Sequence, residues 1–516
     1  RLHEVPLPPG NYAKLRTDGK RLYLLESPQR NAPGGALRTL AIDNLGGKLE
    51  TLAENVRNFE LTVDGKKLML VRSVPPTPGG PVAGDILLVD AGPKLPPEMA
   101  NAQVRWTDWK IATDPRAEWR QMFEDAWRMQ RDYFYDRGMV GVDWLAVRRR
   151  FEPLLPRVTE RDELNDLLAQ MVNELGTLHS QVFTPDLRAA PLTIGAAGLG
   201  GRFRRSAEGF VIERIYRSDP ELPEAAGPLA AAGAMEGETV VAVNGRPTQA
   251  LPDLSELLRG QAGRQVLLAL RSAQGGERSL VVTPVDAQAE SQLQTSDWEW
   301  SLAERTLARS EGRIGYLRLR AMVASDIATF AREFFAHVHR DGLIIDVRSN
   351  NGGAIDSFLI SALMRRAWAF WQARSPETSP PYSNMQQAFR GHLVVLVDEG
   401  TYSDGETFAE GVKRLKLGTL IGQRTAGAGV WLSDRNRLVD NGIMRAAESG
   451  QFVPGDGWII EGRGVTPDVE VDNLPRATFE GGDAQLDAAI AHLQQQIGAR
   501  PPLNPVAPPP PRLPSR

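Results

Sequence analysis

The sequence predicts a multidomain protein in which an antiparallel β region precedes a mixed α/β core, with a small β-rich module inserted into that core. Three observations support this architecture. An Asp-Gly hairpin pattern occurs twice near the N-terminus, a glycine-rich β segment lies in the middle of the chain, and short apolar strands alternate with helical stretches after residue 310. The length of 516 residues exceeds the usual size of one hydrophobic core, so several domains are expected.

The N-terminal repeat consists of YAKLRTDGKRLYLL at residues 12–25 and FELTVDGKKLMLV at residues 59–71. An Asp-Gly pair between alternating apolar residues favours a tight hairpin, because type I′ turns need positive φ angles. The two Asp-Gly pairs recur after 46 residues, which is typical of the blades of a β-propeller. Two blades cannot close a ring, so residues 1–110 are expected to be a truncated propeller. The alternative is a small antiparallel sheet.

A helical segment is expected over residues 111–187. Apolar residues recur at helical spacing in two stretches, one from Trp119 to Phe134 and one from Leu164 to Leu175. The second stretch stops at Gly176, a residue suited to the left-handed cap of a helix, and His179 follows three residues later.

The next segment, residues 188–287, reads as a compact β-rich module. The sequence GLGGRF at residues 198–203 precedes an expected strand at Phe210–Ile215, and AAAGAMEGETVVAVNG follows at residues 230–245. These two stretches resemble a PDZ domain, in which the first is a loop that binds a peptide carboxylate and the second ends in an Asn-Gly turn. The resemblance implies a peptide-binding loop made of Leu199, Gly200, Gly201 and Phe203.

An α/β core is expected over residues 288–490, followed by a proline-rich tail at residues 491–516 that cannot pack into a core. Short apolar strands alternate with helical stretches in this core. The expected strands are Ile314–Arg318, Gly342–Val347 and His392–Val397, and the expected helices are Ser325–His339 and Ala354–Trp371.

Two strand ends in this core carry residues suited to chemistry. At residues 342–353 an apolar strand runs into Asn-Asn-Gly-Gly, and such a glycine pair can leave amide hydrogens facing outward, as an oxyanion hole requires. At residues 393–405 another strand ends just before Ser403, where a helix is expected to begin. The unpaired amides and the dipole of a helix start favour a nucleophile and its oxyanion. Each stretch alone also fits an ordinary turn, and Ser403 alone fits a helix cap.

Taken in order, three motifs resemble the S41 peptidase family: GLIIDVRSNNGG, VVLVDEGTYSDGETFAEGVKRLKLGTLIGQRTAGAG and EGRGVTPDVEVDN. The upstream GTLHS stretch and the PDZ-like segment resemble the tricorn branch of that family, over residues 100–490. The resemblance implies that Ser403 is the nucleophile, His179 its general base and Glu461 the acid that orients the histidine. It also implies an oxyanion hole made of the amide of Asp404 and the amide of Gly353 or Gly352.

The sequence departs from related patterns at three places. Ala428 stands where S41 processing peptidases have the lysine of a Ser-Lys dyad, so that mechanism is not expected. Leu178 stands where the tricorn branch has a serine before its histidine, and Ser180 or Thr177 is a candidate to replace it. The region around Trp371 offers no acid for a basic P1 side chain, and an apolar pocket is an alternative.

The expected function is a serine endopeptidase or oligopeptidase that acts on peptides or unfolded polypeptides. The resemblance implies a homo-oligomer, a hexamer, in the cytoplasm or alternatively the periplasm. The runner-up is a binding protein for peptides or apolar ligands on the same fold.

Composition excludes several other classes. The net charge is −4, so no broad basic field exists for nucleic acid, and the absence of cysteine excludes disulfides and thiolate metal sites. No apolar run reaches the roughly 18 residues of a membrane span. No nucleotide fingerprint is present, so no cofactor and no metal are expected.

Overall fold

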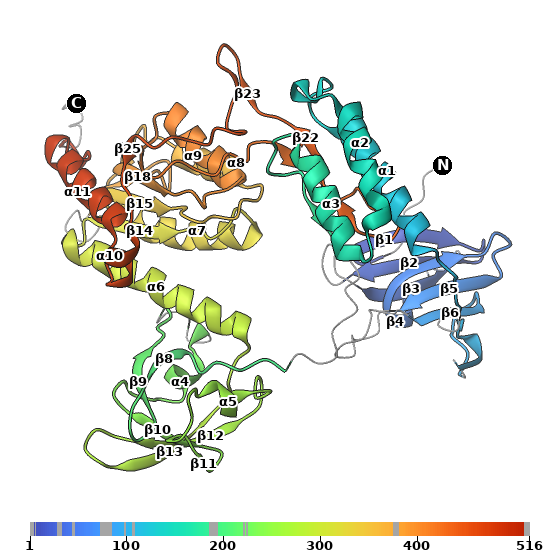
Figure 1. Ribbon diagram of the computed structural model, residues 1–516, viewed down its shortest axis with the longest axis horizontal. Coiled ribbons are helices and arrows are strands. Elements are labelled where there is room, and N and C mark those ends of the chain that lie inside the picture. Colours follow the sequence, from blue (N-terminus) through green and yellow to red (C-terminus); the bar gives the residue numbers. More distant parts are fainter. Residues whose placement is uncertain are drawn as a thin grey trace, which may run out of the picture. The chain divides into compact units, whose positions relative to one another are not determined.

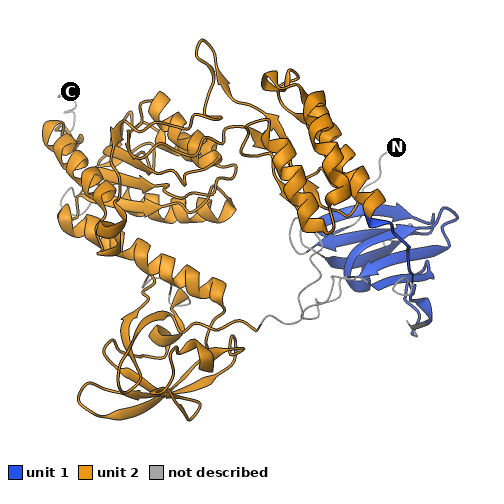
Figure 2. Cartoon of the chain, in the orientation of Figure 1, with its two compact units in different colours: residues 1–115, 187–193 blue, residues 116–186, 194–516 orange. Residues whose placement is uncertain are grey.

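The computed structural model contains two compact units, which are described separately (Figure 2). The first comprises residues 1–115 and 187–193, and the second comprises residues 116–186 and 194–516. The start of the predicted PDZ-like segment, residues 188–193, and the end of the tail, residues 510–516, lie outside the described residues. The structure describes residues 5, 7–27, 34–43, 47–72, 85–97, 100–105, 109–184, 194–219, 222, 225–374 and 381–509.

The first unit is built on one six-stranded antiparallel sheet in which each strand pairs with the next along the chain. Its apolar core lines one side of the sheet and includes Tyr23, Leu37, Phe59 and Leu70. The strands are β1 (Asn11–Thr17), β2 (Arg21–Ser27), β3 (Gly35–Ala41), β4 (Glu50–Leu61), β5 (Lys67–Arg72) and β6 (Asp85–Asp90).

The predicted Asp-Gly hairpins are confirmed, because Gly19 and Gly65 have positive φ in the turns between β1 and β2 and between β4 and β5. The two repeats lie against each other, with the Lys14 ammonium bonded to Asn58 and Glu60. The described strands show no propeller, since all six lie in a single sheet that does not close. The blade interpretation therefore stays a prediction.

The second unit begins with a helical part made of α1 (Pro115–Tyr133), α2 (Trp144–Phe151) and α3 (Arg161–Asn173). The amphipathic faces predicted from the sequence pack together, and Gly176 has the left-handed conformation expected after α3. The same core takes in residues from the far end of the chain. They are Val430, Leu438, Met444 and Ala447.

A PDZ-like module, defined here as residues 194–285, follows the helical part. Its sheet has the order β13-β12-β10-β9-β8, so β8 is an edge strand, and the Asn244-Gly245 turn predicted after β10 is present with positive φ at both residues. Short helices α4 (Pro228–Ala231) and α5 (Ser255–Leu258) cover its core. The strands are β8 (Gly201–Arg205), β9 (Phe210–Ile215), β10 (Thr239–Val243), β11 (Arg246–Pro247), β12 (Val266–Arg271) and β13 (Glu277–Val282).

The rest of the second unit is an α/β core around a five-stranded parallel sheet of order β14-β15-β18-β19-β25 (Figure 1). Successive residues of each strand face opposite sides, because side chains alternate along a strand. One face packs on α7 (Ala324–His337), α8 (Asp356–Leu363) and α9 (Asp404–Arg414), and the other on α6 (Ala287–Arg309) and α11 (Ala484–Ala499). The strands are β14 (Ile314–Arg318), β15 (Gly342–Asp346), β18 (His392–Val397), β19 (Thr419–Gly422) and β25 (Val469–Glu470).

Small elements complete this core. The predicted helix from Ala354 to Trp371 was too long: α8 ends at Leu363, and Phe370–Trp371 forms strand β16, paired with β17 (Tyr382–Ser383). Short two-stranded ribbons join β7 (Val182–Phe183) to β21 (Ile443–Met444), β20 (Trp431–Leu432) to β22 (Ala447–Ser449), and β23 (Phe452–Val453) to β24 (Gly457–Trp458), and a short helix α10 spans Pro475–Phe479.

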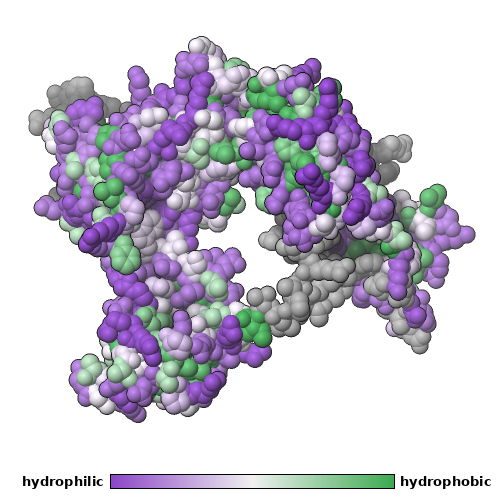
Figure 3. Space-filling view, viewed as in Figure 1, coloured by the Kyte–Doolittle hydropathy of each residue, from purple (hydrophilic) through white to green (hydrophobic). Residues whose placement is uncertain are grey.

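Hydrophilic side chains cover most of the face seen in Figure 3, with apolar residues in small separate groups. Such scattered apolar residues are ordinary on a folded surface. None of the described helices is long and apolar enough to span a membrane.

Candidate active site

Ser403 lies in a sharp turn between the end of β18 and the start of α9, called here the Ser403 turn. Its backbone angles are φ 56° and ψ −119°, a conformation that residues other than glycine rarely adopt. A Cβ on Gly352 would lie only 2.6 Å from the Cβ of Ser403, and Gly352 itself has φ +77°. Ser403 can therefore lie this close to the end of the neighbouring strand only because residue 352 is a glycine.

A buried carboxylate holds the Ser403 turn. Glu406, which is 0% exposed, accepts a hydrogen bond from the Ser403 amide at 3.0 Å. It also accepts bonds from the Thr425 hydroxyl at 2.6 Å and from the amides of Gly427 and Ala428 at 2.7 Å each. Four donors on one carboxylate fix the turn against the 425–429 loop. Sequence reasoning missed Glu406, although the Ser-x-x-Glu spacing of a capping box was a usable signal.

Two backbone amides beside Ser403 donate no hydrogen bond within the described part of the chain: those of Asp404 and Gly353. Gly353 forms a parallel bridge with Met322, in which the residues on either side of Gly353 make the two hydrogen bonds. The N–H of Gly353 itself therefore points away from Met322. The Gly352 amide is already bound to the Asn350 side chain at 2.9 Å. Of the two glycines left open by the sequence, Gly353 is thus the one with a free donor.

The side chain of Asp404 points away from this amide pair and caps α8. Its Oδ2 accepts bonds from the amides of Ile355 at 2.7 Å and Asp356 at 3.1 Å. Burial, together with the nearby Asp356 carboxylate, raises the pKa of Asp404 to about 7. The backbone amide of Asp404 is therefore available to the site, while its carboxyl group binds the N-terminal end of α8.

His179 lies next to the Ser403 turn and is 4% exposed. Its ring packs on the ring of Tyr402, with centroids 4.9 Å apart, and the Tyr402 hydroxyl donates to the Leu178 carbonyl at 3.1 Å. Burial, and then the positive charge of Arg445, lowers the pKa of His179 to about 4, so the imidazole is neutral at pH 7. Among the described residues, its Nδ1 is buried without a hydrogen-bond partner, and no hydrogen bond joins its ring to Ser403 or Glu461.

Glu461 reaches the backbone beside the histidine. It accepts bonds from the amides of Gly429 at 2.7 Å, Val430 at 2.9 Å and Leu178 at 3.3 Å. Burial raises the pKa of Glu461 above its usual range. The preceding residue, Ile460, has φ 67°, so the chain bends sharply to aim this carboxylate inward.

The two auxiliary candidates bind each other: the hydroxyl oxygens of Thr177 and Ser180 lie 2.7 Å apart. Neither contacts Glu461 or His179 through a hydrogen bond in the described structure. Leu178 stands where the branch that this sequence resembles has a serine. Leu178 is 46% exposed, and only its backbone takes part in the site.

The predicted peptide-binding loop of the PDZ-like module is distinct from this site. Leu199 is buried and Phe203 packs on the module's core. The amides of Gly200 and Gly201 point at a carboxylate of the same chain, Glu290.

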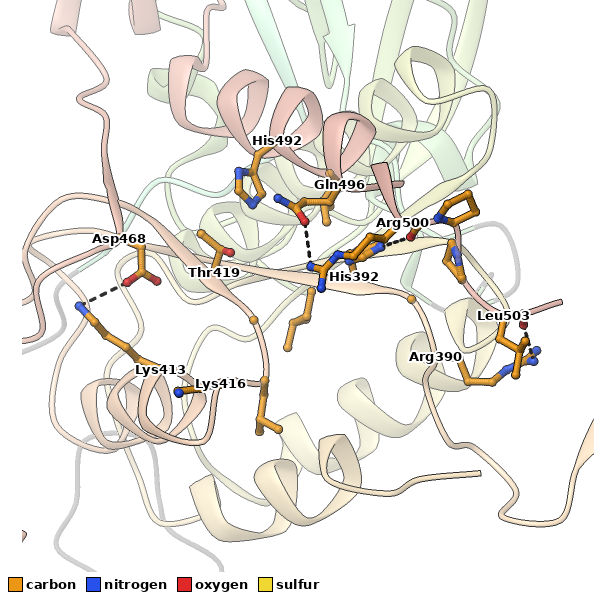
Figure 4. A pocket seen from close by; sticks show the side chains of 17 residues that line it. Arg390, His392, Lys413, Lys416, Thr419, Asp468, His492, Gln496, Arg500 and Leu503 are labelled. Atoms are coloured by element: carbon orange, nitrogen blue, oxygen red, sulfur yellow. Dashed lines mark hydrogen bonds and ion pairs between the residues drawn. The ribbon is translucent and has the colours of Figure 1, made fainter. Parts of the chain in front are cut away.

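A cavity of about 630 Å³ lies at the opposite end of the parallel sheet (Figure 4). His392 begins β18 and lines this cavity, whereas Ser403 follows the end of the same strand. Three of its basic residues, Lys413, Lys416 and Arg500, lie at or just after the C-terminal ends of α9 and α11, where they offset the exposed carbonyls of those helices. No cluster of metal-ligating side chains occurs among the described residues.

Three family models match this chain. Residues 313–471 match the family model described as peptidase family S41, residues 115–173 that of the tricorn protease C1 domain, and residues 197–287 that of the tricorn protease PDZ domain. The chain belongs to the S41 peptidase family. Since all three domains occur in one chain, it belongs to the tricorn branch of that family.

Three relatives of the tricorn type are longer than this chain. It is 36% identical over 398 residues to putative tricorn protease homolog 2 of Streptomyces coelicolor, covering 76% of this chain and 34% of the relative. It is 34% identical over 456 residues to tricorn protease homolog 1 of the same organism, covering 86% and 41%. It is 31% identical over 508 residues to a putative tricorn-like protease C-terminal subunit of Sulfurisphaera tokodaii, covering 96% and 57%. The chain thus spans between a third and somewhat over half of these proteins.

The fold is also that of a solved structure. The crystal structure of the tricorn protease superimposes with a TM-score of 0.84 at 22% identity, covering 96% of this chain and 47% of that one.

Proposed function

We propose that this chain is the catalytic part of a tricorn-type serine peptidase that hydrolyses peptides or unfolded polypeptides through an acyl-enzyme. Family membership supports the reaction class. The observation that carries the proposal is the Ser403 turn: a serine in a strained turn at a helix start, beside two amides that have no acceptor among the described residues. A binding protein gains nothing from maintaining such strain.

In the proposed mechanism, the Ser403 hydroxyl attacks the scissile carbonyl while neutral His179 takes its proton. The amides of Asp404 and Gly353 stabilise the oxyanion of the tetrahedral intermediate. His179 then returns the proton to the leaving amine, and a water molecule hydrolyses the acyl-enzyme by the same steps. Glu461, which binds the Leu178 amide beside His179, is the proposed counter-charge for the imidazolium. Such catalytic contacts often shorten only when substrate is bound.

Two alternatives are less well supported. A Ser-Lys mechanism lacks its base, because Ala428 is buried and uses its amide to hold Glu406. A non-catalytic protein that binds peptides or apolar ligands would not need His179 beside Ser403.

The wider assignment is also part of the proposal. Its substrates are peptides or unfolded chains, its assembly is a homo-oligomer such as a hexamer, and its compartment is the cytoplasm, with the periplasm as the alternative. The proposed domains are propeller blades at 1–110, the histidine-bearing helical part at 111–187, the PDZ-like domain at 188–287, the nucleophile-bearing core at 288–490 and the tail at 491–516.

Labelling with a fluorophosphonate probe tests the catalytic claim. The wild-type chain and a Ser357→Ala control, altered at an exposed serine of α8, should be labelled. Ser403→Ala and His179→Ala should lose the label, and both should lose hydrolysis of a denatured protein substrate. A folded wild-type chain that is neither labelled nor hydrolytic would overturn the proposal and favour a binding protein.

A further inference from the structure

The glycine-rich loop of the PDZ-like module holds a carboxylate from outside the module. Glu290 belongs to the first turns of α6, the helix that follows the module in the chain. Its Oε2 lies 2.8 Å from the Gly200 amide, and its Oε1 lies 3.4 Å from the Gly201 amide.

The loop is shaped for this carboxylate. A Cβ on Gly198 would lie 2.2 Å from the Glu290 Oε2, so only glycine leaves room for the group there. Gly200 has φ +78°, and a Cβ on it would lie 3.0 Å from the Pro228 ring. The glycines that bring the amides forward are thus packed around an acid that the chain itself supplies.

The loop lies at the start of an edge strand. Gly201 is the first residue of β8, and β8 pairs only with β9, so its other edge has no strand partner among the described residues. Free amides at the start of an unpaired strand edge are the two features that capture an extended peptide by its terminal carboxylate. Glu290 occupies the carboxylate end of that arrangement.

The helix that carries Glu290 joins the module to the α/β core (Figure 1), and it is anchored near its middle and again toward its C-terminal end. Asp297 of α6 binds Arg214 of the module through two hydrogen bonds of 2.7 and 2.8 Å, and it also pairs with Arg217. Farther along, Leu302 is buried in the α/β core and Arg305 binds Asp487 of α11. Glu290 is therefore held in place by a helix that joins the module to the α/β core.

We propose that Glu290 is an internal ligand of the PDZ-like module, and that a peptide carboxylate can enter the loop only by displacing it. A tethered group acts at an effective concentration of millimolar or more, so weakly binding peptides cannot compete. Displacement frees the first turns of α6 while the Asp297 contacts keep the module attached. Occupation of the loop by a peptide thereby changes the start of the helix that enters the core. This change does not depend on catalysis at Ser403.

Hydrogen–deuterium exchange of the 196–203 segment in the full chain tests the contact. Glu290→Ala and Glu290→Gln should speed exchange in this segment at least tenfold. Glu304→Gln, on the same helix and paired with Arg217 at the surface, should leave it unchanged. Thermal unfolding checks that each variant is folded, and Glu290→Gln keeps the side-chain shape if the alanine variant is unstable. Unchanged exchange in both variants would overturn the internal contact.

Displacement is tested with a randomised heptapeptide pool bearing free C-terminal carboxylates and the same pool amidated. The free-acid pool should restore protection in the Glu290 variants at concentrations at least tenfold below those needed to act on the wild-type chain, and the amidated pool should restore it in neither. Equal action on wild type and variants, or no protection of the variants by the free-acid pool, would overturn the claim that Glu290 competes with a peptide carboxylate.

Discussion

The two halves of the candidate active site are built in different ways. On the Ser403 side, a fully buried glutamate receives four hydrogen bonds, and a glycine lies against the nucleophile. On the His179 side, the ring is fixed by burial and by Tyr402, its Nδ1 has no partner, and Glu461 binds only backbone amides. The comparison indicates that the candidate nucleophile and its two candidate oxyanion amides are held by hydrogen bonds, whereas the candidate base is held mainly by packing.

Gly352→Ala should break the Ser403 half most severely. The new methyl group would overlap the Ser403 Cβ and require a residue other than glycine at φ +77°. Displacing both the nucleophile and the adjacent amides by about 1 Å should lower kcat/KM by about 10²–10³-fold, measured with a peptide substrate. Gly498→Ala is the matched control, because nothing lies within 4 Å of that position near the end of α11. Equal activity of the two variants would show that the turn is not tightly constrained.

Glu406→Gln should have the next largest effect. The amide nitrogen of glutamine cannot accept a bond, so at least one of the four donors loses its acceptor, at a cost of about 1–3 kcal/mol. We expect kcat to fall by about 10²-fold with little change in KM, since the loss acts on the placement of Ser403. Glu410→Gln, which breaks only the surface pair with Arg414 on the same helix, should be nearly neutral. A change in KM alone would assign Glu406 to substrate binding.

The His179 half can be probed by pH. The pKa of His179 is about 4, below its ordinary value of 6.5, so the active neutral form persists as pH falls and kcat/KM should decline only near pH 4. Stability has the same sign: the unfolded chain takes up the proton first, so the contribution present above pH 6.5 is lost as pH falls toward 4.

Arg445→Gln sharpens this test. Removing the second cause of the low pKa should move the acidic limb of the profile to higher pH, with burial still keeping it below 6.5. An acidic limb at pH 6.5 in the wild-type chain would mean that substrate or solvent reaches the imidazole freely.

Leu178→Ser should give the smallest effect, in the opposite direction. Position 178 already donates its amide to Glu461 and is half exposed, so a hydroxyl there could link that carboxylate to the His179 side. We expect kcat to rise about two- to tenfold, within the range of one added hydrogen bond. Leu178→Ala is the control for loss of the apolar side chain, and an equal gain in both variants would exclude the link.

The sequence predicted elements that depend on local pattern. The strands and the Ser403 turn follow from apolar runs that end in small residues, and Asn244-Gly245 follows from turn chemistry. The length of α8 was mispredicted, because pairing of Phe370–Trp371 with β17 is a tertiary contact that helical spacing does not reveal.

Features of the site that depend on distant partners escaped prediction. One local detail was also not predicted: the Asn350 side chain binds the Gly352 amide two residues later, which leaves the Gly353 amide without an acceptor among the described residues. Glu406 holds the Ser403 turn through hydrogen bonds to the 425–429 loop, and Glu290 binds a loop about 90 residues upstream. Hydrogen bonds across such separations require the folded chain.

The helices that precede His179 also set the point at which the proposed active site can form in a nascent chain. Their core is completed by Val430, Leu438, Met444 and Ala447, and the Gln130 side chain binds the Arg445 carbonyl, 315 positions later. At about 5–20 residues per second, synthesis of that stretch takes roughly 15 to 60 seconds. During this interval, a ribosome-bound chain contains His179 without the packing that fixes it. The proposed active site is therefore incomplete until the residues up to Ala447 have been synthesised.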